Sequence, residues 1–91
     1  MFLDYSSLAR FLRSASKASV FRVTFRDGEQ FELRAIGIGQ DQGRPPHADG
    51  LIVQRIVGKE GQDPGTALFF WLADVVEIQA VADGSVVYAA T

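Results

Sequence analysis

The spacing of apolar residues changes once along this chain, and that change limits the folds that the chain can adopt. Between Tyr5 and Ala15, apolar residues recur every three or four positions, which predicts an amphipathic helix over residues 5–16. From Val20 onward they alternate with polar residues, which is the pattern of β-strands. The sequence therefore predicts one N-terminal helix followed by a β-rich region over residues 20–89.

The first two predicted strands form a hairpin around Asp27 and Gly28, a residue pair that is typical of turns. The register of the hairpin follows from burial, because one of its faces must be apolar along its whole length. Pairing Phe25 with Phe31 meets this condition and requires a turn of three or five residues. We therefore expect these two phenylalanines to lie opposite each other.

Further strands are predicted by β-rich segments that Gly and Pro interrupt. They cover residues 51–57, 67–72, 75–81 and 85–88, with loops at 39–50 and 58–66. Strands at this spacing, with no helices between them, indicate a strongly bent antiparallel sheet or a small barrel. Ninety-one residues leave room for only one hydrophobic core. We expect a single domain over residues 1–91, a five- to six-strand antiparallel barrel or rolled sheet with one helix.

The segments 51–57 and 67–72 are apolar on both faces, whereas a strand with one face in water alternates. Something must therefore cover the outside of the sheet here. The N-terminal helix is one candidate, and a partner or a second subunit is the other, since large exposed apolar patches usually mark interfaces. The candidate interface residues are Ile52, Ile56, Phe69 and Trp71.

The charge of the chain is unevenly distributed. Its net charge of −2 and its isoelectric point of about 5.2 disfavour a domain that binds nucleic acid over its whole surface. Residues 1–26 nevertheless contain five bases and one acid, while residues 27–91 contain four bases and ten acids. The basic residues form either a solvated face or a surface for phosphates or an acidic partner. The basic candidates are Arg10, Arg13, Lys17, Arg22, Arg26 and Arg34, of which the last three share one face of the predicted hairpin.

No residue pattern in the chain predicts catalysis, a cofactor or a metal site. There is no cysteine, which suits a reducing cytoplasm and excludes thiolate chemistry. The one histidine, His47, is close to Asp41 and Asp49 but has no second ligand of its kind, and we interpret it as an ordinary exposed loop residue. Neither a secretory leader nor a stretch of about 20 apolar residues is present, so we expect a cytoplasmic protein without a membrane partner.

Two short motifs suggest a family. Val23-x-Phe25-x-Asp27-Gly28-x-x-Phe31 resembles the opening motif of Sm-like small β-barrels, which are related in shape to SH3-like barrels. Phe70-x-Leu72-Ala73-Asp74-Val75-x-x-Ile78 resembles their closing motif, in which one strand turns over into the last. The resemblance covers roughly residues 5–80 and implies a barrel of the RNA-chaperone type, or of the type that inhibits the transcription terminator Rho by binding protein. The second glycine of the opening motif, the Asp-x-x-x-Asn of the uridine pocket and the basic-glycine pair of the closing motif are absent.

Two functions are consistent with these features. The first is a non-enzymatic protein-interaction module, including one that associates with itself, acting through the apolar face near Phe69 and Trp71. The second is an RNA-binding Sm-like barrel that uses the basic N-terminal face. The acidic net charge and the missing uridine-pocket motif favour the first.

Overall fold

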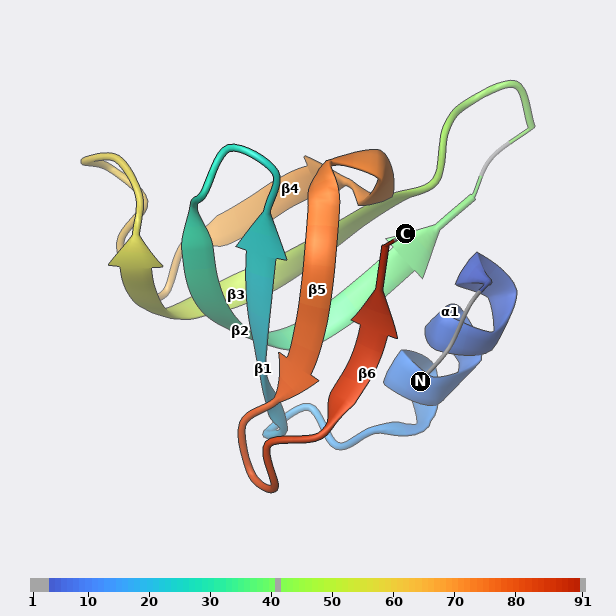
Figure 1. The fold of residues 1–91 in the computed structure, drawn as a ribbon, viewed down its shortest axis with the longest axis horizontal. Helices are drawn as coiled ribbons and strands as arrows, with labels where there is room; N and C mark the ends of the chain where they lie inside the picture. The colour runs from blue at the N-terminus through green and yellow to red at the C-terminus, as the bar shows by residue number, and fades with distance from the viewer. Residues whose placement is uncertain (1–3, 41, 91) are drawn as a thin grey trace.

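The computed structural model describes residues 4–40 and 42–90, as one α-helix, one short 3-10 helix and six strands (Figure 1). Helix α1 spans Tyr5–Ser14, and the 3-10 helix η1 spans Leu72–Asp74. The strands are β1 (Val20–Phe25), β2 (Gln30–Gly39), β3 (His47–Val57), β4 (Ala67–Trp71), β5 (Val75–Ala80) and β6 (Val86–Ala89). They form one antiparallel sheet in the order β4-β3-β2-β1-β5-β6, which confirms the predicted mainly β fold with an N-terminal helix.

Helix α1 begins after the capping residue Asp4 and ends two residues earlier than predicted. The Asp4 carboxylate accepts hydrogen bonds from the Ser7 backbone N–H at 2.8 Å and from the Ser7 hydroxyl at 3.0 Å, and these bonds lower the pKa of Asp4. The helix stops at Ala15, where the backbone becomes extended with ψ at 149°. Leu8 and Leu12 lie one turn apart and are both buried, so this face of the helix packs into the core.

The β1–β2 hairpin keeps the predicted apolar face but differs in register by two residues. Val23, rather than Phe25, lies opposite Phe31. The Phe25 N–H donates to the Glu29 carbonyl at 2.9 Å, which closes a three-residue turn whose last residue, Gly28, has φ at 92°. A shift of two residues leaves every side chain on its own face, so the apolar pattern alone does not distinguish the two registers. The rings of Phe25 and Phe31 still meet edge to face at 6.1 Å.

The sheet is rolled, but it is not closed into a barrel. Strands β4 and β5 are joined by η1 alone, although β3, β2 and β1 lie between them in the sheet. The sheet must therefore curl until β4 approaches β1. The rings of Phe25 on β1 and Phe70 on β4 meet edge to face at 5.2 Å. Among the described residues no ladder joins β4 to β1 or β5, so aromatic side chains fill the seam in place of strand pairing, and a closed barrel is wrong.

The first long loop is shorter than predicted. Strand β2 continues to Gly39 and β3 begins at His47, so the prediction of a loop over residues 39–50 is wrong at both of its ends. The N–H of Leu72 donates to the Pro46 carbonyl at 3.1 Å, so pairing resumes directly after the prolines. A proline lacks only its own N–H, and its carbonyl still accepts a hydrogen bond.

Helix α1 does not cover the outer face of β3 and β4. It packs mainly against β2, and Figure 1 shows it beside the ends of β2 and β6. The ring of Phe11 meets that of Phe21 at 6.1 Å, and the ring of Tyr5 meets that of Tyr88 at 6.0 Å. The helix is thus wrong as the candidate cover, and Phe69 on β4 is 52% exposed.

Candidate protein-binding surface

Three aromatic side chains lie together on the outer side of β3 and β4. The ring of His47 stacks on that of Phe69 at 5.4 Å and an angle of 29°. The ring of Trp71 meets Phe69 at 5.2 Å and His47 at 6.1 Å, both nearly at right angles. Phe69 is 52% exposed and Trp71 is 36% exposed, so the cluster is open to a partner. We refer to His47, Phe69 and Trp71 as the aromatic surface.

The absence of a side chain at Gly39 allows this arrangement. Gly39 on β2 lies directly opposite His47 on β3. A Cβ atom at Gly39 would come within 2.5 Å of Nε2 of His47 and within 3.0 Å of its Cε1. The imidazole therefore lies across the glycine backbone and extends from there toward Phe69.

Strand β4 is an edge of the sheet, and the described residues leave its outer side without a strand partner. The N–H of Leu72 donates to Pro46, and the N–H of Ile52 donates to Thr66 at 2.9 Å. In an antiparallel ladder, hydrogen-bonded pairs alternate with pairs that share no hydrogen bond. Counted from these two bonded pairs, every second residue of β4 bonds to β3. Ala67 and Phe69 consequently direct their backbone N–H and C=O groups away from β3, toward open space.

A groove of about 420 Å³ adjoins this free edge. Aromatic residues of β1, β2 and β4 form much of its wall, and three carboxylates, Asp27, Glu29 and Asp74, also line it. Arg26 is the one base among the lining residues, and its Nε donates to the Ala73 carbonyl at 2.8 Å. Oε2 of Glu29 is buried and accepts no hydrogen bond in the described part of the chain. The groove is therefore apolar with an acidic rim.

Two of the four predicted interface residues lie elsewhere. Ile52 is only 3% exposed and belongs to the core, so it takes no part in the surface. Ile56 is 39% exposed, but it lies five residues beyond Leu51, the last β3 residue that pairs with β4. Only Phe69 and Trp71 come together. His47 was not predicted as part of the surface, although the alternation of polar His47 and Asp49 with Ala48 and Gly50 was the available signal for a strand.

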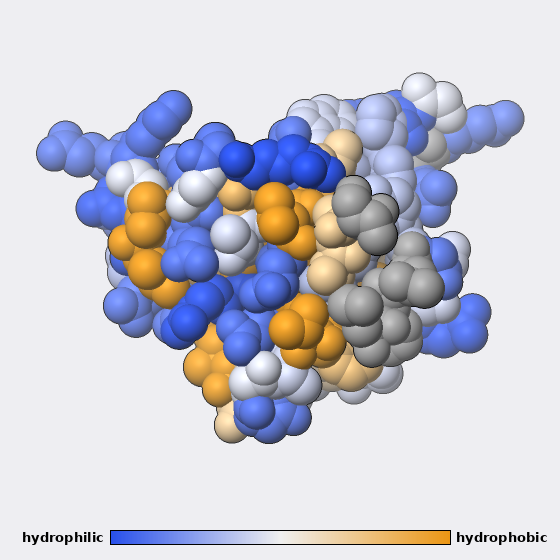
Figure 2. Space-filling model, viewed as in Figure 1, coloured by the Kyte–Doolittle hydropathy of each residue, from blue (hydrophilic) through white to orange (hydrophobic). Residues whose placement is uncertain are grey.

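Other apolar side chains on the surface are dispersed. On the face turned toward the viewer in Figure 2, hydrophobic residues form separate groups among hydrophilic ones. Among the described residues, the exposed large apolar side chains are those of Val53, Ile56, Val57, Phe69, Trp71, Val76, Val81 and Val86. Phe69 and Trp71 are the only aromatic residues among them, and their side chains are in contact.

The predicted basic residues of the hairpin do not form one face. Arg22 makes an ion pair with Glu32 at 3.0 Å on the outer side of β1 and β2. Arg26 lies in the turn after β1, where its side chain binds the Ala73 carbonyl. Arg34 is exposed on β2, opposite Val20. The six basic candidates are therefore divided among the outer sheet, the turn after β1, and α1 with the segment that follows it.

The two aspartates close to His47 in the sequence provide no metal site in the described residues. Asp49 on β3 lies opposite Phe69 on β4, and Asp41 lies outside the described residues. No group of three or more His, Cys, Asp or Glu side chains that could hold a metal occurs in residues 4–40 and 42–90. In the same residues, no helix is long and apolar enough to cross a bilayer.

Comparisons with protein-family models, with curated proteins and with solved structures found no match for this chain.

Proposed function

We propose that this protein is a non-enzymatic protein-interaction module that binds an extended segment of another protein along the free edge of β4. One observation carries the proposal: β4, from Ala67 to Trp71, has neither a charged residue nor a proline, and no described strand pairs with its outer edge. Soluble proteins usually protect such edges with lysine, proline, bulges or a covering element. An unprotected edge beside exposed aromatic rings is typical of a site to which a partner strand adds.

The ladder geometry supports this binding mode. The free N–H and C=O groups of Ala67 and Phe69 would pair with the backbone of the partner. Side chains of an added strand alternate between the two faces of the sheet. One set would lie against the aromatic surface, and the other set would enter the adjoining groove.

The charges around the edge favour a partner of a particular chemistry. The groove is lined by three carboxylates and one base, and that base already binds Ala73. An apolar segment that carries lysine or arginine matches this rim, while a phosphate backbone is repelled by it. The same acidic rim on a second copy disfavours pairing of this surface with itself.

The Sm-like resemblance is consistent with this proposal. The strand order and the short η1 connection between β4 and β5 agree with a closing motif in which one strand turns over into the next. Within that resemblance, the protein-binding type of barrel fits better than the RNA-binding type, because the basic candidates are divided among three places. A reducing compartment such as the cytoplasm suits a chain without cysteine.

The test uses short synthetic peptides and fluorescence anisotropy. A peptide that alternates valine and lysine is expected to bind, and the same peptide with glutamate in place of lysine is expected to bind at least about ten-fold more weakly. A third peptide, N-methylated at alternate backbone nitrogens on the side that faces β4, is expected not to bind, since it cannot form the ladder. Amide exchange at Ala67 and Phe69 is expected to slow when the lysine peptide binds.

Two variants separate the aromatic surface from general surface hydrophobicity. Trp71→Ser is expected to weaken peptide binding by about ten-fold or more, as loss of an interface aromatic usually does. Val86→Ser on β6 is the matched control, because Val86 is 37% exposed, nearly the same as Trp71, and lies on the opposite edge of the sheet. Equal effects of the two variants would overturn the proposal. So would sub-micromolar binding of a uridine-rich oligomer that weakens steeply with salt, which would establish the RNA-binding alternative.

A further inference from the structure

We infer that Glu29 is the specificity-determining residue of the groove beside β4, where its carboxylate receives the cationic end of one lysine or arginine side chain of the bound strand. The inference rests on the proposed function and deepens it, because it assigns the preference for a basic partner to one residue and one position of the partner. It concerns the inner side of the added strand, whereas Phe69 and Trp71 contact the outer side.

Glu29 faces the inner side of the sheet although it is charged. At the start of β2, odd-numbered residues such as Phe31 and Leu33 are buried, and even-numbered residues are more exposed. Glu29 directly precedes β2 and has the same parity. Its carbonyl accepts from the N–H of Phe25 at 2.9 Å, and its own N–H donates to the Asp27 carboxylate at 2.9 Å. The backbone is thus fixed, and the side chain joins Phe31 in the wall of the groove.

One oxygen of the Glu29 carboxylate is buried and has no partner. Oε2 has no hydrogen-bond donor among the described residues, and the carboxylate forms no ion pair with any of them. Arg26, the one base that lines the groove, donates its Nε to the Ala73 carbonyl at 2.8 Å instead. A buried oxygen without a donor costs free energy, so nearly all such groups in native proteins are hydrogen-bonded. A donor supplied by the partner would remove this cost.

The charges around Glu29 favour a cationic donor over a neutral one. Asp27 and Asp74 line the same groove, which therefore has three carboxylates and one base. Like charges gathered in a cleft with apolar walls strengthen the attraction for a counter-ion. A hydrogen bond between an ammonium or guanidinium group and a carboxylate is also about twice as strong as a neutral one. A hydroxyl or amide of the partner would satisfy Oε2 but leave the negative charge of the groove uncompensated.

The apolar part of the groove suits the stem of a basic side chain. The ring of Phe25 meets that of Phe70 at 5.2 Å and that of Phe31 at 6.1 Å, and all three residues line the groove. Lysine and arginine bury their methylene stems along apolar surface and keep the charged end in polar contact. The volume of about 420 Å³ lies in the range of about 300–1,000 Å³ that is typical of pockets for small molecules. The groove therefore has room for a whole side chain.

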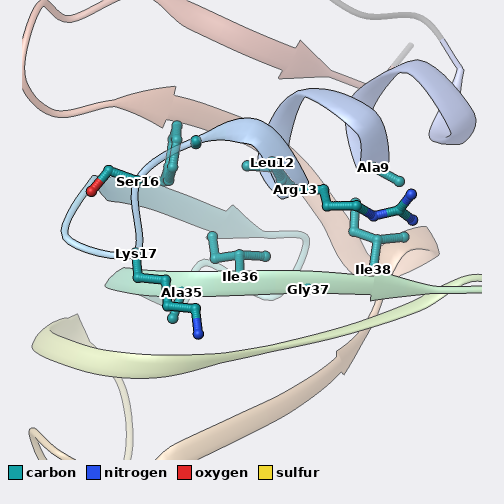
Figure 3. A pocket seen from close by; sticks show the side chains of 11 residues that line it. Ala9, Leu12, Arg13, Ser16, Lys17, Ala35, Ile36, Gly37 and Ile38 are labelled. Carbon is teal, nitrogen blue, oxygen red and sulfur yellow. The ribbon is translucent and has the colours of Figure 1, made fainter.

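The groove between α1 and β2 shows that charge at a groove is not sufficient for such a site. Arg13 and Lys17 line it, but Figure 3 shows them at its opposite ends, with the ammonium of Lys17 beyond β2. Their charges do not meet at one point, and among the described residues no buried, unpartnered side-chain nitrogen or oxygen belongs to its lining. Beside β4, the buried oxygen of Glu29 gives the charge a defined position.

The test is a double-mutant cycle between protein and peptide, measured with the full chain by fluorescence anisotropy. One peptide alternates valine and threonine and has a single lysine in place of the central threonine. The second has norleucine there, which keeps an apolar stem and lacks the charge. The parent protein is expected to bind the lysine peptide at least about ten-fold more tightly, the usual worth of a charged hydrogen bond. Glu29→Gln keeps the shape of the side chain, and is expected to reduce this preference to about two-fold or less.

Two controls separate recognition from a structural role. Glu60→Gln makes the same change in an exposed loop outside the groove, and it is expected to leave the preference for lysine unchanged. Urea unfolding of the free protein is expected to show the same or a higher midpoint for Glu29→Gln, because the variant removes a buried charge that has no partner. A lower midpoint would show that a partner within the fold already satisfies the carboxylate, and would overturn the inference.

The binding results also distinguish this inference from the proposed function. Equal affinity of the parent for the two peptides, or a preference in Glu29→Gln equal to that of the parent, would overturn the role of Glu29 and leave strand addition to β4 in place. If neither peptide bound, the proposed function would fail, and the inference would fail with it.

Discussion

Two sides of the rolled sheet are not closed by strand pairing, and they differ in how far their apolar side chains are covered. On one side α1 inserts Leu8 and Leu12, both buried, and completes the core. On the other side no element of the described chain covers β4, and Phe69 and Trp71 stay partly exposed. The α1 side carries Arg10, Arg13 and Lys17, while the groove beside β4 is lined by three carboxylates.

The difference shows how one apolar pattern can have two outcomes. A strand that is apolar on both faces requires a cover, and in the part of the chain that the structure describes, helix α1 covers the β2 side and leaves β4 open. The β4 side therefore has the composition of a core strand and the exposure of a surface strand. This is the condition in which a partner completes the structure, and the following predictions are arranged to test the contrast.

The largest expected effect is at the seam between the two sides. Phe31 is fully buried, and its ring meets that of Phe25, which in turn meets Phe70 of β4. Phe31→Ala is expected to reduce the free energy of unfolding by about 3–5 kcal/mol, because it leaves a large cavity in a small core. Urea denaturation of Phe25→Ala, of Phe31→Ala and of the double variant Phe25→Ala/Phe31→Ala measures this loss.

The double variant of the seam is expected to lose less than the sum of the single variants, since rings in contact are energetically coupled. Exact additivity would contradict the packing of Phe25 on Phe31. In that case the curling of β4 toward β1 would have to depend on other contacts.

The second prediction compares one residue from each side. Leu8→Ala on α1 is expected to cost about 2–5 kcal/mol, since Leu8 has no exposed surface. Phe69→Ala on β4 is expected to cost less than about 1 kcal/mol in the isolated protein, because half of its side chain is already in water. A similar loss in both variants, measured by thermal or urea unfolding, would show that the β4 side is covered in solution, for example by a second copy.

The third prediction concerns the pH dependence on the α1 side. Burial, together with the neighbouring Tyr5 hydroxyl, raises the pKa of Tyr88 to about 12 from its ordinary value of 10.0. A raised pKa means that the neutral phenol stabilises the folded state fully below pH 10, and that this stabilisation is lost as the pH rises through about 12. The free energy of unfolding is therefore expected to fall between pH 10 and pH 12.

Ultraviolet absorbance of the phenolate and urea unfolding at each pH measure this effect. In Tyr88→Phe, the part of the decline that belongs to this group is expected to disappear. An identical pH dependence in parent and variant would show that Tyr88 is not buried as the structure has it.

The sequence predicted the parts of the fold that depend on local spacing. Leu8 and Leu12 reveal the helix, and the alternation through Phe21, Val23 and Phe25 reveals the first strand and its buried face. The register of the hairpin was not predictable from this pattern, because pairings two residues apart bury the same faces. The choice between the two registers depends on the turn, where Gly28 adopts the positive φ that a three-residue connection needs.

The candidate surface was predicted in part for a similar reason. Phe69 and Trp71 stood out because they lie on one parity of an apolar strand. Ile52 lies in a segment that is also apolar on both faces, and only the three-dimensional arrangement shows which face is inside. His47 was missed because the prolines before it indicate a loop, whereas its cross-strand pairs with Gly39 and Trp71 depend on residues distant in the sequence.

The smallest expected effect is at Ala35, the one described residue other than glycine that has a positive φ. Replacing it with glycine removes the unfavourable left-handed conformation of alanine, which costs about 1–2 kcal/mol. The same change raises the conformational entropy of the unfolded chain, which offsets about 0.4–1 kcal/mol of that gain. Ala35→Gly is therefore expected to stabilise the protein by about 0.5–1 kcal/mol in urea denaturation. Ala89→Gly near the end of β6 is the control and is expected to destabilise, because glycine weakens a strand in ordinary extended conformation. A loss of stability in both variants would mean that Ala35 is not strained in solution, and the bulge of β2 between Arg34 and Gly37 would then be an ordinary feature of the strand.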